Sequence, residues 1–266
     1  MFGREVLQST ESLLRNTAVG IRVLSFGRLE RALSHDRYLE ERLFTQEERE
    51  YCKGRIYSLA GRLAAKFSVR QVLHAPVPWQ EVSTIPLPTG QPVVVLTGSA
   101  AELAQQKGIQ DIAVSISHDE GYSAAIAVPT TDLGDRKKVG IDLTSLRRMA
   151  QLCDRFNPHL RTRIFTPAEV KDAAGNVARL AQKWGVKESV LKILCHGAKI
   201  RLADIESISS GKSRLTISLR NAASIYAEQQ GLHTWEVMVT PCYAMEMAVV
   251  TAYSRTIHSQ PQPNQT

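Results

Sequence analysis

Residues 19–22 read Val-Gly-Ile-Arg and residues 139–142 read Val-Gly-Ile-Asp, so one short motif recurs after 120 residues. Two further matches follow in the same order at a spacing of 121 residues: Arg-Leu-Phe-Thr at 42–45 with Arg-Ile-Phe-Thr at 163–166, and Lys-Phe-Ser-Val at 66–69 with Lys-Glu-Ser-Val at 187–190. Matches at near-constant spacing are typical of an internal repeat. The sequence therefore predicts two tandem copies of one small domain.

The boundary between the copies is expected in a polar segment, 129–138, which contains proline and glycine and is predicted to form a turn or short linker. We place it near Asp132, which gives an N-terminal copy over 1–132 and a C-terminal copy over 133–256. Residues 257–266 carry two prolines and no apolar periodicity, so a disordered tail is predicted there.

Each copy is expected to mix helices with strands. In the second copy, apolar spacing predicts a helix over 183–194, a strand over 215–219, a helix over 222–230 that stops at Gly231, and a buried strand over 244–253. These elements indicate the α+β class.

Composition is that of a globular protein, with 43% hydrophobic and 22% charged residues in a chain of 266. There is no run of eighteen apolar residues and no apolar core of a signal peptide near the N-terminus, so a cytoplasmic location without a membrane partner is predicted. The four cysteines lack C-x-x-C spacing and are expected to be free thiols. The net charge of +7 favours an acidic partner, but an aromatic content of 6% without basic-aromatic motifs argues against nucleic acid.

Chemically useful side chains are divided between the copies. The second copy holds Gly-Ile-Asp at 140–142 and Trp-Gly-Val-Lys-Glu-Ser-Val-Leu-Lys at 184–192, whereas Arg22 and Phe67 replace the two carboxylates in the first copy. The first copy in turn holds Ser-Ile-Ser-His at 115–118, where the second reads Met-Val-Thr-Pro at 238–241, and proline cannot donate a hydrogen bond. Each motif alone would have an ordinary structural explanation, such as a surface i,i+4 pair for Glu188 and Lys192. Each copy keeps the motif that the other has lost, so the losses of the two copies are complementary.

These three motifs, G-I-D, K-E-x-x-x-K and S-x-S-H, resemble those of the 4'-phosphopantetheinyl transferase superfamily over residues 18–255. Each copy is similar to a holo-acyl-carrier-protein synthase domain, and the tandem chain resembles the fused, pseudodimeric type of the surfactin-synthetase-activating layout. The resemblance implies two α+β domains related by a pseudo-twofold axis, one composite active site and a functional monomer.

The resemblance also implies the reaction and its groups. Coenzyme A would be the substrate that donates 4'-phosphopantetheine to a serine of an acyl or peptidyl carrier protein, with release of adenosine 3',5'-bisphosphate. Asp142 and Glu188 would bind Mg²⁺, which prefers oxygen ligands, and Mn²⁺ could substitute. The implied catalytic residues are Asp142, Glu188, Lys192 and His118. The implied coenzyme A ligands are Arg62, Lys53, Arg55, Ser117, His118 and Lys192.

Details of the chemistry follow from the residue types. Lys192 lies four residues after Glu188, so on a helix its ammonium could reach the same pyrophosphate as the metal. Glu188 would take the serine proton directly or through a metal-bound water. In the fused type a third acidic residue often stands where this chain has Thr144, so a water or the Thr144 hydroxyl would fill that coordination position.

The carrier is expected to dock on arginines after Asp142, because carrier proteins are acidic around their modified serine. Arg148 and Arg155 resemble arginines that the family uses for this purpose, and Arg147 is added because it lies beside them. The pathway of the carrier, whether fatty acid, polyketide or nonribosomal peptide synthesis, is left open. The alternative function is a non-catalytic module that binds coenzyme A or a carrier protein.

Overall fold

The computed structural model describes residues 19–131, 137–155, 163–194, 200–210 and 215–254. In its first half the elements, in chain order, are β1 (Gly20–Ser25), α1 (Phe26–His35), α2 (Leu39–Leu43), α3 (Gln46–Cys52), α4 (Ile56–Leu73), a 3-10 turn (Trp79–Glu81), β2 (Val82–Pro86), β3 (Pro92–Leu96), α5 (Gly98–Gln106), β4 (Asp111–Asp119) and β5 (Tyr122–Thr130). In its second half they are β6 (Lys137–Ser145), α6 (Leu146–Arg155), α8 (Pro167–Ala173), α9 (Val177–Leu194), a 3-10 turn (Leu202–Asp204), β7 (Ile205–Ser209), β8 (Leu215–Leu219), α10 (Asn221–Gln229), β9 (Thr234–Cys242) and β10 (Met245–Tyr253).

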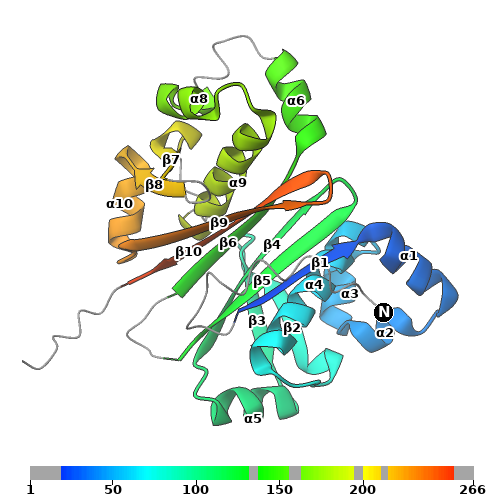
Figure 1. The fold of residues 1–266 in the computed structure, drawn as a ribbon. Helices are drawn as coiled ribbons and strands as arrows, with labels where there is room; N and C mark the ends of the chain where they lie inside the picture. The colour runs from blue at the N-terminus through cyan, green and yellow to red at the C-terminus, as the bar shows by residue number, and fades with distance from the viewer. Residues whose placement is uncertain (1–18, 132–136, 156–162, 195–199, 211–214, 255–266) are drawn as a thin grey trace, which may run out of the picture.

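The strands form two antiparallel three-stranded sheets, ordered β1-β5-β4 and β6-β10-β9, and two hairpins, β2-β3 and β7-β8. The two large sheets lie side by side in the middle of the molecule, with the helices of the first half on one outer side and those of the second half on the other (Figure 1). The α+β class is therefore confirmed, and apart from α2, whose counterpart would fall mostly on residues outside the described part, the element order of the first half recurs in the second.

The inner faces of the two sheets share one apolar core. Ile21 and Ile126 from the first half pack in the same buried cluster as Ile141, Met247 and Val249 from the second. Separate clusters bury the outer faces beneath α4 and α9. Apolar burial therefore holds the two halves together as well as stabilising each of them.

Both halves contain the same buried ion pair. Thr45 and Thr166 begin α3 and α8 with capping boxes, whose glutamates, Glu48 and Glu169, also reach a lysine eighteen positions later. Lys66 Nζ lies 2.7 Å from Glu48 Oε2, and Lys187 Nζ lies 2.8 Å from Glu169 Oε2, all fully buried. Each ammonium also donates to backbone carbonyls, including that of Val82 or Leu202. These additional bonds compensate the desolvation of the charges.

The glycine of each Val-Gly-Ile motif allows a strand to cross a helix closely. A Cβ on Gly20 would lie 1.9 Å from the Ser68 carbonyl oxygen, and one on Gly140 would lie 2.1 Å from the Ser189 carbonyl oxygen. No side chain fits there. The repeated glycine thus fixes β1 against α4 and β6 against α9.

Most predicted elements are confirmed, with shifted ends. The helix predicted over 183–194 begins earlier, at Val177, and the strand over 215–219 has the expected bounds. The helix over 222–230 is α10, followed by Gly231 at positive φ, and the buried strand over 244–253 is β10.

The predicted linker was too long, because β5 continues through Thr130 and β6 begins at Lys137, where pairing with Tyr253 of β10 outweighs the polar composition. The proposed boundary at Asp132 and the tail 257–266 lie outside the described residues. Cys52, Cys153 and Cys242 are free thiols as expected, and Cys195 lies outside the described part. Within the described residues, no helix is long and apolar enough to cross a membrane.

Candidate active site

A row of side-chain hydrogen bonds joins β4 of the first half to β6 of the second. The backbone N–H groups of Ile141, Leu143 and Ser145 donate to side-chain oxygens of Ser115, Ser117 and Asp119, at 3.1, 3.2 and 2.9 Å. β6 is an edge strand, and alternate residues of β4 provide acceptors for alternate residues of that edge. This β4–β6 ladder places the Ser-Ile-Ser-His segment beside the Gly-Ile-Asp segment.

Asp142 lies at the centre of this junction and is 7% exposed. Its Oδ1 accepts hydrogen bonds from Ser117 Oγ at 2.9 Å and Lys192 Nζ at 3.0 Å, and its Oδ2 accepts from Thr144 Oγ1 at 2.9 Å. Lys192 Nζ also donates to the Ile141 carbonyl at 2.7 Å. The carboxylate orientation is thus fixed by side chains from both halves. A water or the Thr144 hydroxyl was expected to fill a coordination position, and this hydroxyl donates here to Asp142.

Asp142 lines a cavity of about 260 Å³, which we call the acidic cavity. It is lined by His118, Asp119, Asp142, Leu143, Thr144, Ser145, Arg148, Met149, Leu152, Trp184 and Glu188. Burial raises the pKa of the Glu188 carboxyl, and the negative charge of Asp142 raises it further, whereas Lys192 lowers it. The structure therefore brings the predicted carboxylates and the histidine together, as the composite site requires.

The residues of the acidic cavity fit a hard divalent cation. The protein alone does not complete such a site, because among the described residues no group of three His, Cys, Asp or Glu side chains could hold a metal. Asp142 and Glu188 supply two carboxylates, and no hydrogen bond to the Glu188 carboxylate is found in the described part of the chain. Mg²⁺ is commonly held by one or two carboxylates together with substrate phosphates and waters. A cation would also relieve the repulsion that raises the pKa of Glu188.

A group of basic and aromatic side chains lies at the start of α4. The His118 ring stacks on Tyr57 at 5.0 Å, and the Arg62 guanidinium lies 4.2 Å from the centroid of the Tyr51 ring. Arg55 lies 5.7 and 5.8 Å from the Tyr51 and Tyr57 rings. Desolvation lowers the pKa of His118, as does the positive charge of Lys192, which favours the neutral imidazole. The sequence analysis missed both tyrosines, which stand beside the predicted basic residues.

The predicted coenzyme A ligands therefore fall into two places. Ser117, His118 and Lys192 surround Asp142, whereas Arg55 and Arg62 lie with the tyrosines and do not line the acidic cavity. Arg62 is 8% exposed, and its buried Nε has no hydrogen-bond partner among the described residues. Lys53 follows α3 in the left-handed conformation and is exposed, and its side chain makes no hydrogen bond, ion pair or ring contact in the described part of the chain.

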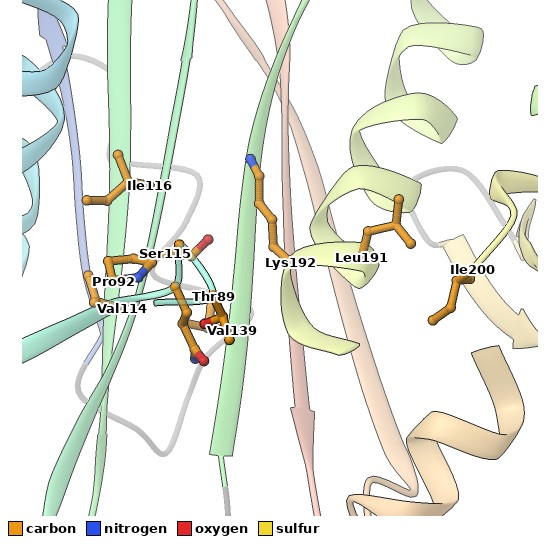
Figure 2. Close-up of a pocket in the computed structure, with 11 residues that line it drawn as sticks. Thr89, Pro92, Val114, Ser115, Ile116, Val139, Leu191, Lys192 and Ile200 are labelled. Atoms are coloured by element: carbon orange, nitrogen blue, oxygen red, sulfur yellow. The ribbon is translucent and has the colours of Figure 1, made fainter. Parts of the chain in front are cut away.

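A second cavity, which we call the junction cavity, has a volume of about 390 Å³ and also lies between the halves. Figure 2 shows Val114, Ser115 and Ile116 on one side of it and Leu191, Lys192 and Ile200 on the other. The β2–β3 turn contributes residues 89–92. Because Lys192 lines this cavity and also bonds to Asp142, it links the junction cavity to the acidic cavity.

Arg147 and Arg148 project from the start of α6 and are 71% and 67% exposed in their side chains. Arg147 pairs with Glu120 at 2.9 Å, and Arg148 pairs with Asp119 at 2.7 Å. Asp119 is the last residue of β4 and Glu120 follows it in the turn, so these pairs cross between the halves. Arg155 is the last residue of α6, and its side chain lies outside the described part.

Comparison with known proteins agrees with the motifs. The model of the 4'-phosphopantetheinyl transferase superfamily matches residues 138–247. A holo-[acyl-carrier-protein] synthase of Beutenbergia cavernae is 40% identical over 112 residues, which are 41% of this chain and 94% of that protein. One from Salinispora arenicola is 38% identical over 116 residues, 42% of this chain and 95% of that protein.

Among solved structures, the Helicobacter pylori holo-[acyl-carrier-protein] synthase in complex with coenzyme A is 26% identical, with a TM-score of 0.39, and the match covers 42% of this chain and 99% of that one. Less than half of this chain thus spans nearly the whole of the curated relatives. On the identity and coverage of those relatives, the chain belongs to the 4'-phosphopantetheinyl transferase superfamily.

Proposed function

We propose that this chain transfers the 4'-phosphopantetheine arm of coenzyme A to a serine of an acyl or peptidyl carrier protein, at one composite site per chain. The observation that carries the proposal is the meeting of Asp142 and Glu188 of the second half with His118 of the first half in one cavity. Neither half alone has all these groups. The N-terminal copy (1–132) would supply coenzyme A ligands, and the C-terminal copy (133–256) would supply the carboxylates.

Coenzyme A would bind across the junction between the halves. Its phosphates are anionic, and Lys192, His118 and Arg62 offer donors from both halves. The unsatisfied buried Nε of Arg62 supports an anionic ligand at the start of α4, because a buried donor without a partner is costly. The apolar walls of the junction cavity, including Val114, Val139 and Leu191, suit the adenine base.

The reaction is a displacement at the β-phosphorus of coenzyme A. The carrier serine oxygen forms a bond to this phosphorus, and the bond from phosphorus to the bridging oxygen breaks, so that adenosine 3',5'-bisphosphate leaves. Mg²⁺, when bound by Asp142 and Glu188, supplies positive charge to the pyrophosphate. Lys192, held beside Asp142, neutralises further charge on the same group.

Glu188 is the best placed acceptor for the proton of the serine hydroxyl. As an ionised carboxylate on the wall of the acidic cavity, it would accept this proton directly. His118, kept neutral by desolvation, would donate its N–H to a phosphate oxygen without taking part in the proton transfer. The Ser117 and Thr144 hydroxyls keep Asp142 oriented during the reaction.

The acidic carrier would dock on α6. Arg148 lines the acidic cavity and the exposed Arg147 precedes it on α6, so a carrier bound to them would bring its serine close to Glu188. Arg155 is proposed for the same surface. Because both halves of the site are covalently joined, a monomer would be active.

The test is mass spectrometry of apo carrier proteins after incubation with this chain, coenzyme A and Mg²⁺. A gain of about 340 Da marks the transferred arm. Wild type and Arg22→Ala should modify at least one carrier of the fatty acid, polyketide or peptidyl classes, whereas Asp142→Ala should not. If wild type modifies none of them but still binds coenzyme A, the chain is a binding module and not a transferase.

A further inference from the structure

Asp119, the last residue of β4, lines the acidic cavity, and the proposed reaction gives it no role. Its side chain is 10% exposed. Oδ2 accepts a hydrogen bond from the Ser145 backbone N–H at 2.9 Å. Oδ1 accepts from the Glu120 backbone N–H at 3.0 Å and from Arg148 Nη1 at 2.7 Å. The bonds with Ser145 and Arg148 cross from the first half of the chain to the second.

Ser145 connects Asp119 to the start of α6. The Ser145 hydroxyl accepts from the Arg148 backbone N–H at 3.1 Å, which is the hydrogen bond that an N-cap residue makes. Asp119 therefore holds α6 at two points, through the backbone of the residue before the helix and through a side chain of its first turn. A carboxylate is also favourable beside a helix N-terminus, where the backbone N–H groups carry partial positive charge.

The guanidinium of Arg148 gains a fixed direction from this contact. Its side chain is 67% exposed, and ordering such a long side chain only when a partner binds would cost free energy. The bond to Asp119 uses Nη1, and no other hydrogen bond of this guanidinium is found among the described residues. Donors of the same guanidinium thus remain for a carboxylate of a partner protein.

The other junction between the halves lacks this arrangement. At an offset of 123 residues, Cys242 takes the position of Asp119. Cys242 is 1% exposed, and burial raises the pKa of its thiol to about 11, so a neutral group stands where β4 has a carboxylate. Arg28 takes the position of Arg148 at an offset of 120 residues, and no ion pair of Arg28 is found among the described residues. In the described part of the chain, the arrangement thus occurs only beside the acidic cavity.

We propose that Asp119 is a positioning residue for the carrier protein, because it holds Arg148 and the start of α6 in the arrangement that an acidic carrier meets. This inference rests on the proposed function, since it concerns the carrier of that reaction. The charge of Asp119 would itself repel an acidic carrier, but a carboxylate that is 10% exposed and paired with a guanidinium is largely hidden from it. The preorganisation of Arg148 therefore outweighs the repulsion.

The experiment measures initial rates of carrier modification by mass spectrometry over a range of carrier concentrations, with saturating coenzyme A and Mg²⁺. Asp119→Asn keeps an oxygen that can accept from the Ser145 N–H but removes the charge that holds Arg148. Asp111→Asn, at the exposed first residue of β4, is its matched control. Arg148→Ala and the double variant of Asp119→Asn with Arg148→Ala complete a cycle, and Arg28→Ala is the control for Arg148→Ala. Urea unfolding verifies that each variant is folded.

Asp119→Asn should raise KM for the carrier by about fivefold with kcat within about twofold, whereas Asp111→Asn and Arg28→Ala should leave both constants unchanged. The double variant should have the KM of Arg148→Ala, because a residue that acts through Arg148 has no effect once that side chain is absent. A further rise of KM in the double variant would show a general structural role and would overturn the proposal. A change confined to kcat would overturn it as well.

Failure of this inference is distinguishable from failure of the proposed function. If wild type modifies no carrier, the proposed function is wrong and the positioning role is wrong with it. If wild type is active but Asp119→Asn has the same KM as Asp111→Asn, only the positioning role is wrong.

Discussion

Equivalent strands and helices in the two halves of the chain position different side chains. In the second half, β6 and α9 bring Asp142 and Glu188 to one cavity, and β4 of the first half approaches to complete it. In the first half, β1 and α4 bring Arg22 and Phe67 together at the corresponding place. A repeat can thus keep its structural residues in both copies while one copy keeps the carboxylates. The predictions below exploit this difference, because each position in one half has a matched control in the other.

Glu188→Gln should have the largest effect on activity. The substitution preserves shape but removes the charge, and with it a metal ligand and a proton acceptor. We expect the rate of carrier modification to fall by about a thousandfold, within the range for loss of a general base. Initial rates measured by mass spectrometry give the number.

Phe67→Leu, at the corresponding position in the first half, is the control and should keep the rate within about threefold, because Phe67 packs on Arg22 and Trp79 and lines neither the acidic cavity nor the junction cavity. If Phe67→Leu abolished transfer as Glu188→Gln does, the assignment of a single composite site would be wrong.

Lys66→Met and Lys187→Met should destabilise the fold to a similar extent. Each leaves a buried glutamate, Glu48 or Glu169, without its cation. Removing one partner of a buried pair costs about 3 to 5 kcal/mol of unfolding free energy. Urea unfolding of both variants checks this. A large difference between them would mean that the repeated ion pair has a role in the catalytic half beyond stability.

Part of this arrangement was accessible to sequence analysis. The motifs at near-constant offsets predicted that Asp142, Glu188 and His118 would lie together, and the three residues do line one cavity. The Thr-x-x-Glu capping boxes and the lysine eighteen residues later also recur in both copies, so the buried ion pairs left a signal that was not used.

The contacts between the halves could not be predicted in the same way. The β4–β6 ladder depends on how one sheet lies against another, and a side chain that accepts from a distant backbone N–H leaves no partner pattern in the sequence. The alternation of Ser115, Ser117 and Asp119 along β4 was the one sign of this ladder in the sequence. Of the three, only Ser117 was predicted to have a role, and that role was binding coenzyme A. Tyr51 and Tyr57 gave no motif, because their importance arises from the fold of α3 against α4.

Ser117→Ala tests the β4–β6 ladder. The change removes the acceptor of the Leu143 N–H and a donor to Asp142, both buried. An unsatisfied buried polar group costs about 1 to 3 kcal/mol. Thr240→Ala, the corresponding position in the second half, has no hydrogen bond of its side chain in the described residues and should cost less than about 0.5 kcal/mol. Equal losses in urea unfolding would show that the ladder adds nothing to the junction.

Glu120→Gln should have the smallest effect, and on docking only. Glu120 holds Arg147 across the junction, and an acidic carrier would compete with it for the same guanidinium. Removing the charge makes the surface more positive, so KM for the carrier should fall by about twofold at low salt with kcat unchanged. The difference should disappear at high salt, where exposed charges are screened. Glu102→Gln on α5, an exposed glutamate away from α6, is the control and should leave KM unchanged. A rise in KM for Glu120→Gln would instead mean that Glu120 positions Arg147 for the carrier and does not compete with it.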